Sequence, residues 1–178
     1  MRKVVLFIAM SLDGYIADEN GGVDWLEGQN PDAETPDTYA EFIKEVDTVI
    51  MGWNTYQQVS AELSPDEWAY HGLTSYVVTH RELPSTEEII FTQTSPCVIV
   101  DKLRQREGKN IWICGGADLI QQLERSDKID EYYISIIPTI LGNGIRLFGV
   151  YPKERRLQLI HTQSYNGITD LVYVRRTM

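Results

Sequence analysis

Apolar residues gather in short runs separated by turn residues, which is typical of buried strands in a layered fold. The run from Val4 to Met10 is continuously apolar and predicts a central strand buried on both faces. Shorter runs at Thr48 to Met51, Leu73 to Thr79 and Asn110 to Cys114 predict further strands, and Ile89 to Thr92 is a weaker candidate. The sequence therefore predicts a sheet built largely from the chain before residue 115.

Between these runs the apolar positions change to a spacing of three and four residues, which favours amphipathic helices. The stretch from Thr38 to Val46 has this spacing and predicts a helix. Asn54 to Val59 and Ala117 to Arg125 predict two more, and Val98 to Arg106 begins apolar and continues as a charged helix.

The end of the chain has a different pattern. Glu131 to Ile140 predicts a strand, and Leu157 to Tyr165 and Thr169 to Arg176 flank Asn166-Gly167, a strong hairpin signal. We expect an α/β fold whose mixed, mostly parallel central sheet has helices on both faces and closes with an antiparallel hairpin. No repeat or long linker divides the 178 residues, so we expect a single domain over residues 1–178.

Composition narrows the classes of partner. Hydrophobic residues make up 43% and charged residues 24%, as in an ordinary globular protein. The net charge of -10 argues against nucleic acid or an anionic membrane as the main partner. No apolar run has the length of a membrane span, and Cys97 and Cys114 adjoin apolar runs as expected of core thiols. Two core thiols are typical of a protein in the reducing cytoplasm, so we expect that location. We expect no bound metal, because no His, Cys or carboxylate cluster has the spacing of metal ligands.

The turn at Gly115-Gly116 is the most informative local feature. An apolar strand ends in two glycines, and a helix begins at once with Ala117. The first N–H groups of a helix have no internal partner, and the helix dipole favours negative charge beside them. The turn therefore suits a pyrophosphate, although an ordinary strand-to-helix turn also prefers Gly. The spacing is not that of the GxGxxG fingerprint.

Two other predicted strands end in comparable groups. Gly52 follows the second strand, and Thr55 falls in the next first turn, where it would cap the helix or contact a phosphate. Thr79, His80 and Arg81 follow the third strand and suit a phosphate monoester, although a solvated loop is the simpler interpretation of these residues alone. Ligands of open α/β sheets collect at the carboxyl ends of the strands, so we expect the three ends to share one site.

Six short motifs, in order, extend over nearly the whole chain. They are AMSLDGYIA at residues 9–17, DWL at 24–26, VIMGWNTY at 49–56, VTHR at 78–81, ICGGA at 113–117 and PTILGNGIRLF at 138–148. With these motifs the chain resembles the dihydrofolate-reductase-like family. Within that family it is most similar to the reductase domain of bacterial riboflavin biosynthesis and its stand-alone relatives.

The resemblance implies a dihydrofolate-reductase-like three-layer sandwich that binds NADPH. The matching cofactor positions are Gly115, Gly116, Ala117, Leu119, Gly52 and Thr55 for the pyrophosphate, Thr79, His80 and Arg81 for the adenosine phosphate, and Ala9, Ile16 and Ala17 for the nicotinamide. The substrate would lie between the first strand and the helix that holds Phe42, with Met10, Ser11, Trp25 and Thr38 as further candidates.

The chain departs from the family pattern at two positions. Thr38 stands where dihydrofolate reductases have an acidic residue that binds the pterin, with Asp37 just before it. Trp53 stands where those enzymes usually have an Arg that holds the 2′-phosphate, so preference for NADPH depends on His80 and Arg81. Asp13 is the alternative candidate for the proton donor, and an Asp-Gly turn former is its other interpretation.

The sequence therefore predicts an NADPH-dependent reductase that transfers hydride to a small heterocyclic or carbonyl substrate. The closest type is the 5-amino-6-(5-phosphoribosylamino)uracil reductase. The alternatives are dihydrofolate reductase and, from another class, a nucleotide-binding protein without turnover.

A homodimer is also expected, with a small molecule as the other partner. The run Tyr132 to Ile137 is rich in β-formers and would lie at a sheet edge, which proteins usually cover. In stand-alone relatives the stretch matching Ile140 to Phe148 lies near the subunit contact. The alternative is an interior strand and a monomer.

Overall fold

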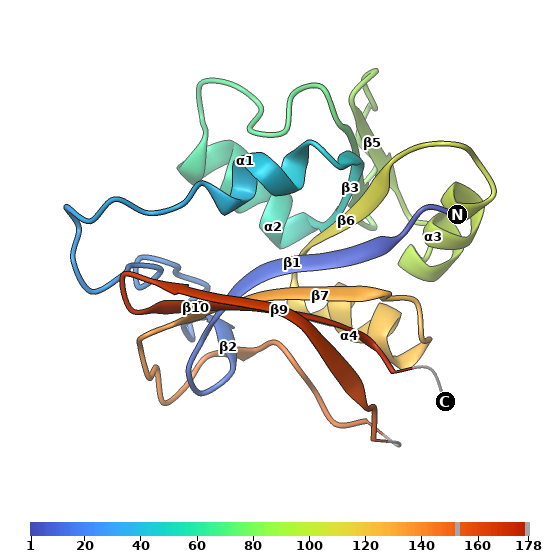
Figure 1. The fold of residues 1–178 in the computed structure, drawn as a ribbon. Coiled ribbons are helices and arrows are strands. Elements are labelled where there is room, and N and C mark those ends of the chain that lie inside the picture. Colours follow the sequence, from blue (N-terminus) through green and yellow to red (C-terminus); the bar gives the residue numbers. More distant parts are fainter. Residues whose placement is uncertain (152–153, 177–178) are drawn as a thin grey trace.

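An eight-stranded sheet forms the centre of the molecule, as the computed structural model of residues 1–151 and 154–176 shows (Figure 1). The strand order is β5-β4-β3-β6-β1-β7-β10-β9. The strands are β1 (Val4–Ser11), β3 (Val46–Gly52), β4 (Thr74–Val78), β5 (Ile89–Thr92), β6 (Asn110–Gly115), β7 (Glu131–Ile137), β9 (Leu157–Tyr165) and β10 (Ile168–Arg175). The neighbours from β5 to β7 pair in parallel, and β10 pairs antiparallel with both β7 and β9. The predicted mixed sheet with a closing hairpin is confirmed.

Helices cover both faces of the sheet and make it the middle of three layers. They are α1 (Thr38–Ile43), α2 (Trp53–Gln58) with a π-helical turn η1 (Val59–Leu63), α3 (Pro96–Arg104) and α4 (Ala117–Arg125). Helices α3 and α4 pack on one face with the buried side chains of β1, β6 and β7. Helices α1 and α2 pack on the other face around Val49, Met51 and Trp112. Strand residues point alternately to the two faces and both faces are covered, so a central parallel strand such as β1 has apolar residues on both sides.

Several boundaries differ from the sequence prediction. The first helix ends at Ile43 and not at Val46, because Val46 is buried as the first residue of β3. Strand β7 ends at Ile137, directly before Pro138. A short antiparallel pair, β2 (Tyr15–Ala17) and β8 (Ile145–Arg146), was not predicted, because strands this short have no periodicity of their own.

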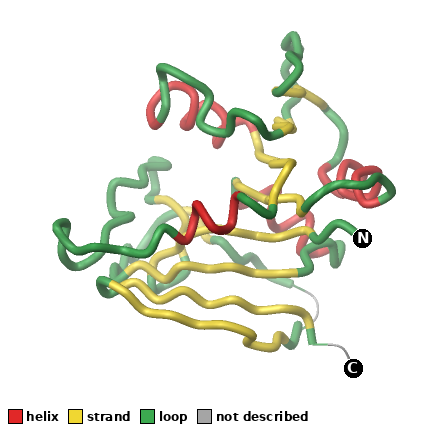
Figure 2. Tube along the Cα trace, turned by 45° about the horizontal axis from the view of Figure 1, so that its top comes forward, coloured by secondary structure: helices red, strands yellow, loops and turns green. Residues whose placement is uncertain are grey.

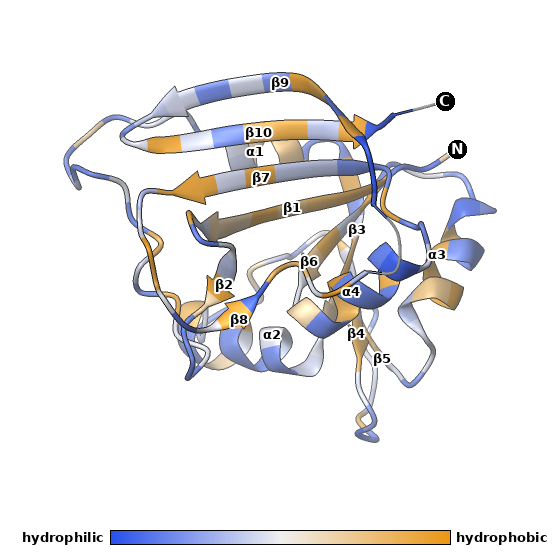
Figure 3. Cartoon of the chain, turned by 90° about the horizontal axis from the view of Figure 1, so that it is seen from below, coloured by the Kyte–Doolittle hydropathy of each residue, from blue (hydrophilic) through white to orange (hydrophobic). Residues whose placement is uncertain are grey.

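The predicted position of Tyr132 to Ile137 is wrong. These residues belong to β7, which lies between β1 and β10 in the interior of the sheet. The edges are formed by β5 and by β9, and Figure 3 shows β9 at the outer side of the hairpin. Both faces of β7 are covered, so its side chains are buried or half-buried along the whole strand. The hydrophobic pattern of a strand reports this covering of its faces and does not reveal whether the strand has one or two neighbours.

Among the described residues, no helix is both long and apolar enough to cross a membrane.

Candidate functional site

A cleft of about 1640 Å³ opens where β3, β4 and β6 end. All twelve residues that the sequence assigned to the cofactor line this cleft. They are Ala9, Ile16, Ala17, Gly52, Thr55, Thr79, His80, Arg81, Gly115, Gly116, Ala117 and Leu119. The parallel pairing of these strands brings their carboxyl ends together, although residues 9 and 119 are far apart in sequence.

The Gly115-Gly116 turn leaves the start of α4 open. Gly116 is the N-cap residue, and no side chain caps the helix. A Cβ built on Gly116 would meet only Thr55 Oγ1, at 3.6 Å, an ordinary contact. Gly115 has φ +149°, a conformation that favours glycine. The first-turn N–H groups of α4 therefore face a region that side chains do not fill, which suits an anion. Asp118 also lines this part, and its carboxylate accepts from Gln122 Nε2 at 3.3 Å.

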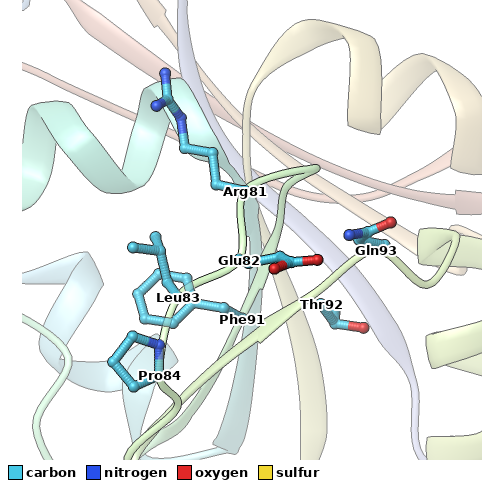
Figure 4. Close-up of a pocket in the computed structure, with 7 residues that line it drawn as sticks. All are labelled: Arg81, Glu82, Leu83, Pro84, Phe91, Thr92 and Gln93. Atoms are coloured by element: carbon cyan, nitrogen blue, oxygen red, sulfur yellow. The ribbon is translucent and has the colours of Figure 1, made fainter.

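A cationic group lies at the end of β4. The backbone N–H of Arg81 donates to Thr79 Oγ1 at 3.1 Å, and the Arg81 guanidinium carbon lies 4.6 Å from the centroid of the Trp53 ring. The side chain of Arg81 extends away from Leu83 and Pro84 (Figure 4). Trp53 therefore supports the guanidinium of Arg81, and a cation lies at the start of α2 although that helix does not supply it.

Arg81 also borders a second, smaller hollow. This hollow measures about 450 Å³ and is lined by Arg81, Glu82, Leu83, Pro84, Phe91, Thr92 and Gln93 (Figure 4). Its apolar wall and the neighbouring guanidinium form a place where a flat aromatic group and a phosphate could bind side by side.

The predicted substrate residues fall into three groups. Phe42 stacks on Phe7, with ring centroids 4.2 Å apart, and Thr38 is the first residue of α1 above this stack. Trp25 donates its indole N–H to the carbonyl of Gly22 and packs in the loop before α1. Met10 packs with the core on the α3 and α4 face, opposite to Phe42, because neighbouring strand residues point to opposite faces. The structure therefore does not bring Met10 to the predicted wall.

The carboxylate at the start of α1, that of Asp37, is used to cap the helix and does not point freely to the predicted substrate wall. The Asp37 carboxylate accepts from the backbone N–H of Ala40 at 2.9 Å and caps the helix. Thr38 takes the position that the resemblance gives to an acidic residue. The α1 helix therefore offers hydroxyl and aromatic groups to this face of the sheet.

Asp13 ties two loops together. Its carboxylate accepts from Ser11 Oγ at 2.6 Å and from the backbone N–H groups of Leu141 and Gly142 at 3.1 and 2.8 Å. The hydrogen bond from Ser11, supported by these two, holds the pKa of Asp13 below its usual range. A carboxyl group with a lowered pKa is poorly suited to donate a proton, and the geometry fits the turn-forming interpretation of Asp13. Ser11 is buried and serves this same tie.

Tyr70 and Cys114 form a pair in the cleft that the sequence did not reveal. The Tyr70 hydroxyl lies 3.5 Å from Cys114 Sγ, and both residues line the cleft. Burial raises the pKa of Cys114 to about 11 and raises the pKa of Tyr70 above its usual value. Both groups therefore keep their protons near neutral pH. Tyr70 lies in the irregular stretch before β4, where no periodic pattern indicates which side chains turn inward.

Within residues 1–151 and 154–176, no group of three or more His, Cys, Asp or Glu side chains is arranged to hold a metal ion.

Comparisons with known proteins agree with this geometry. The uncharacterized protein YwjB of Bacillus subtilis is 40% identical over 175 residues, covering 98% of both chains. The uncharacterized protein YyaP of the same organism is 30% identical over 182 residues, covering 97% of this chain and 94% of its own. A solved structure described as a riboflavin biosynthesis protein from Shewanella sp. PV-4 has a TM-score of 0.83 at 30% identity, covering 98% of this chain and 99% of its own.

Two more distant structures share the fold. One is the diaminohydroxyphosphoribosylaminopyrimidine deaminase/5-amino-6-(5-phosphoribosylamino)uracil reductase of Thermotoga maritima, with a TM-score of 0.75 at 16% identity; the match covers 98% of this chain and 57% of that one. The other is a pyrimidine reductase-like protein of Corynebacterium diphtheriae, with a TM-score of 0.66 at 20% identity over 99% and 93% of the two chains. The family model for the RibD C-terminal domain, a reductase domain, matches residues 2–173. This chain therefore belongs to the RibD C-terminal domain family.

Proposed function

We propose that this protein is an NADPH-dependent reductase that transfers hydride to a small heterocyclic or carbonyl substrate. The observation that carries the proposal is the single cleft in which three strand ends collect all twelve expected cofactor residues. The reductase domain family to which the chain belongs supports the same reaction class.

The cleft offers a separate place for each charged part of the cofactor. The diphosphate would bind at the uncapped start of α4, beside Gly116 and Thr55. The 2′-phosphate would bind Arg81, held over Trp53, with Thr79 and His80 beside it. The hollow beyond Arg81, with its apolar wall, would take the adenine. The nicotinamide, which supplies the hydride, would lie against Ala9, Ile16 and Ala17.

The chain's own contribution is mainly orientation and the exclusion of water. Ala9 leaves room on β1 beside the cleft, and Ile16 and Ala17 form part of the wall that shields this end. An ordered water would protonate the reduced substrate, and the Tyr70 hydroxyl, which keeps its proton and lines the same cleft, would orient this water.

The substrate type that fits the relatives best is a pyrimidine, because one solved structure is named as a 5-amino-6-(5-phosphoribosylamino)uracil reductase and another as a pyrimidine reductase-like protein. Dihydrofolate reductase is the first alternative, and Thr38 in place of an acid counts against it. A cofactor-binding protein without turnover is the second.

Two measurements test the proposal. NADPH fluorescence should change on titration with the protein, and oxidation of NADPH should accelerate with at least one substrate in a panel of pyrimidines, ketones and quinones. No NADPH binding would refute the proposal, and binding without turnover on any panel member would favour the non-enzymatic alternative.

A further inference from the structure

A carboxylate lies fully buried on the sheet face below α1. Asp170 in β10 has no exposed surface. Its oxygens accept hydrogen bonds from Ser135 Oγ at 2.6 Å, Gln163 Nε2 at 2.9 Å, Tyr133 Oη at 3.1 Å and Tyr165 Oη at 3.4 Å. We call these five residues the Asp170 cluster.

All four donors in the Asp170 cluster are neutral. No Lys, Arg or His among the described residues forms an ion pair with Asp170. A buried carboxylate without a cation costs free energy that neutral hydrogen bonds offset only in part. Burial and Asp170 together raise the pKa of Tyr133 to about 12, so this neighbour stays neutral. The cluster therefore contributes negative charge that nothing within it neutralises.

A row of paired strand residues connects the cluster to the edge of the cleft at Ala9. In the sheet, Ala9 pairs with Ser135, Ser135 with Asp170, and Asp170 with Gln163. Residues paired across neighbouring strands point to the same face. This row therefore runs from Ala9, at the edge of the cleft, across the α1 face of the sheet to the hairpin.

An aromatic surface adjoins the cluster on the same face. Phe7 stacks on Phe42, and its ring centroid lies 4.7 Å from that of Tyr133 and 6.3 Å from that of Tyr39. Tyr39 is 38% exposed, so this surface reaches solvent. Aromatic faces carry negative potential and attract cations. The rings and the carboxylate therefore favour the same sign of charge.

The chain from β1 through α1, the last part of which covers this face, carries acidic but no basic residues. Residues 4–43 contain no Lys, Arg or His; their nine acidic residues are Asp13, Asp18, Glu19, Asp24, Glu27, Asp32, Glu34, Asp37 and Glu41. The loop that leads into α1 is fixed beside the hairpin, because the N–H groups of Gln29 and Asn30 donate to the backbone and side-chain oxygens of Asn166 (Figure 2). The basic residues that flank this stretch, Lys3 and Lys44, are paired with Glu131 and Glu41.

We propose that Asp170 makes the α1 face of the sheet, where the family resemblance places the substrate, prefer a planar group that carries positive charge or several N–H donors. Each hydroxyl that donates to Asp170 keeps lone pairs that can accept from a ligand. The carboxylate makes these oxygens better acceptors without contacting the ligand itself. Asp170 is therefore a specificity-determining residue, and the phosphate of a phosphorylated substrate would lie away from this face. The inference rests on the proposed function only in assigning this face to the substrate.

A matched series of three probes tests the charge preference. Benzamidine, benzamide and benzoate share one shape and carry positive, zero and negative charge. Binding at 0.15 M salt, measured by NMR of ¹³C-labelled tyrosine rings, should favour benzamidine over benzoate by about tenfold or more, with benzamide between them. The signals of Tyr133 and Tyr165, assigned with Phe substitutions, should shift with benzamidine. Equal binding of benzamidine and benzoate, or shifts confined to other tyrosines, would overturn the proposal.

Asp170→Asn removes the charge and keeps the shape. In a folded Asp170→Asn protein, the preference for benzamidine over benzoate should fall to about threefold or less. The control is Asp101→Asn on α3, which removes one charge from an exposed pair with Lys128 and should leave the preference unchanged. An unchanged preference in Asp170→Asn would show that the overall charge of -10, and not this residue, attracts the cation. If Asp170→Asn does not fold, the tyrosine shifts of the wild-type protein decide the question.

The same samples separate this inference from the proposed function. NADPH titration tests the cofactor site, and the probe series tests the α1 face. Failure of NADPH to bind, with the charge preference intact, would refute the reductase and keep the proposed preference of the α1 face. The reverse result would keep the reductase and refute that preference.

Discussion

The proposed preference for NADPH over NADH rests on the Arg81 guanidinium, which lies over the Trp53 ring. Arg81→Ala should weaken NADPH binding by about 10- to 150-fold, because a hydrogen bond to a charged group contributes about 1.5–3 kcal/mol and each 1.4 kcal/mol is tenfold. NADH has no 2′-phosphate, so its affinity should change by about twofold or less. The reduced dinucleotides are otherwise identical, and their ratio isolates this contact.

The contribution of the Trp53 ring, which lies against the Arg81 guanidinium, can be measured with the same two dinucleotides. An exposed cation–π contact contributes about 0.5–1 kcal/mol, so Trp53→Ala should weaken NADPH by about two- to fivefold through this contact. In the Arg81→Ala background the same change should have little effect on the ratio of NADPH to NADH affinity, because no guanidinium remains to be oriented. Such a double-mutant cycle measures the coupling directly.

Calorimetry or NADPH fluorescence gives the affinities, and circular dichroism confirms that each variant is folded. Arg106→Ala serves as the control, because it removes an exposed positive charge from the turn after α3, away from the cleft. Equal weakening of NADPH and NADH by Arg81→Ala would place the 2′-phosphate elsewhere. A similar loss in Arg106→Ala would attribute the effect to the overall charge of the protein.

Four further predictions follow from the same structure. Gly116→Val should lower NADPH affinity by at least about tenfold with an intact fold, because its side chain would fill the space above the start of α4; unchanged affinity in titration would refute the diphosphate assignment. Purified protein should reduce dihydrofolate poorly in an NADPH oxidation assay, because Thr38 replaces the acid, and ordinary enzymatic rates would contradict this. Asp13→Asn should lower the melting temperature at neutral pH. Because the folded pKa of Asp13 is lowered, its stabilisation is present above the unfolded pKa of about 4 and disappears as the pH falls through the folded pKa. The melting temperatures of the two proteins should therefore converge in acid, and a difference independent of pH would exclude the charge as the cause. Light scattering should give twice the 20.4 kDa mass of one chain, and Leu159→Lys on the exposed edge strand β9 should lower the mass toward that of one chain. A wild-type mass of 20.4 kDa at high concentration would rule out the homodimer.

The dimer prediction keeps its conclusion but changes its basis. The sequence placed the exposed edge at Tyr132 to Ile137, and the structure places it at β9, where Leu159 and Ile160 are 46% and 51% exposed. An apolar run indicates burial but not which neighbours provide it. The strand order is set by long-range pairing, here by the antiparallel pairing of β10 with β7. The local periodicity of the sequence does not reveal which strands pair.

The meeting of the three strand ends in one cleft was predictable, because each of its parts is local. A strand, a glycine turn and the first turn of a helix lie within about ten residues of one another, and the parallel sheet then aligns three such units at one edge. The support of Arg81 by Trp53 was not predictable in this way. The two residues end neighbouring parallel strands, and only the register that pairs Gly52 with Val78 brings their side chains together.

The buried carboxylate on the α1 face of the sheet was not predictable from local sequence. The sequence indicates that α1 lacks the expected acid at Thr38. The acids beside that position are Asp37, which caps the helix, and Glu41, which is exposed and paired with Lys44. The structure supplies a carboxylate to the same face of the sheet from β10, and Asp170 meets its partners in β7 at separations of 35 and 37 residues. An electrostatic requirement can be met from any element that borders the site, because charge acts over several ångströms in a partly buried environment. Thr38 therefore counts against a direct carboxylate contact from α1, which dihydrofolate would use, but it does not exclude negative charge on the face as a whole.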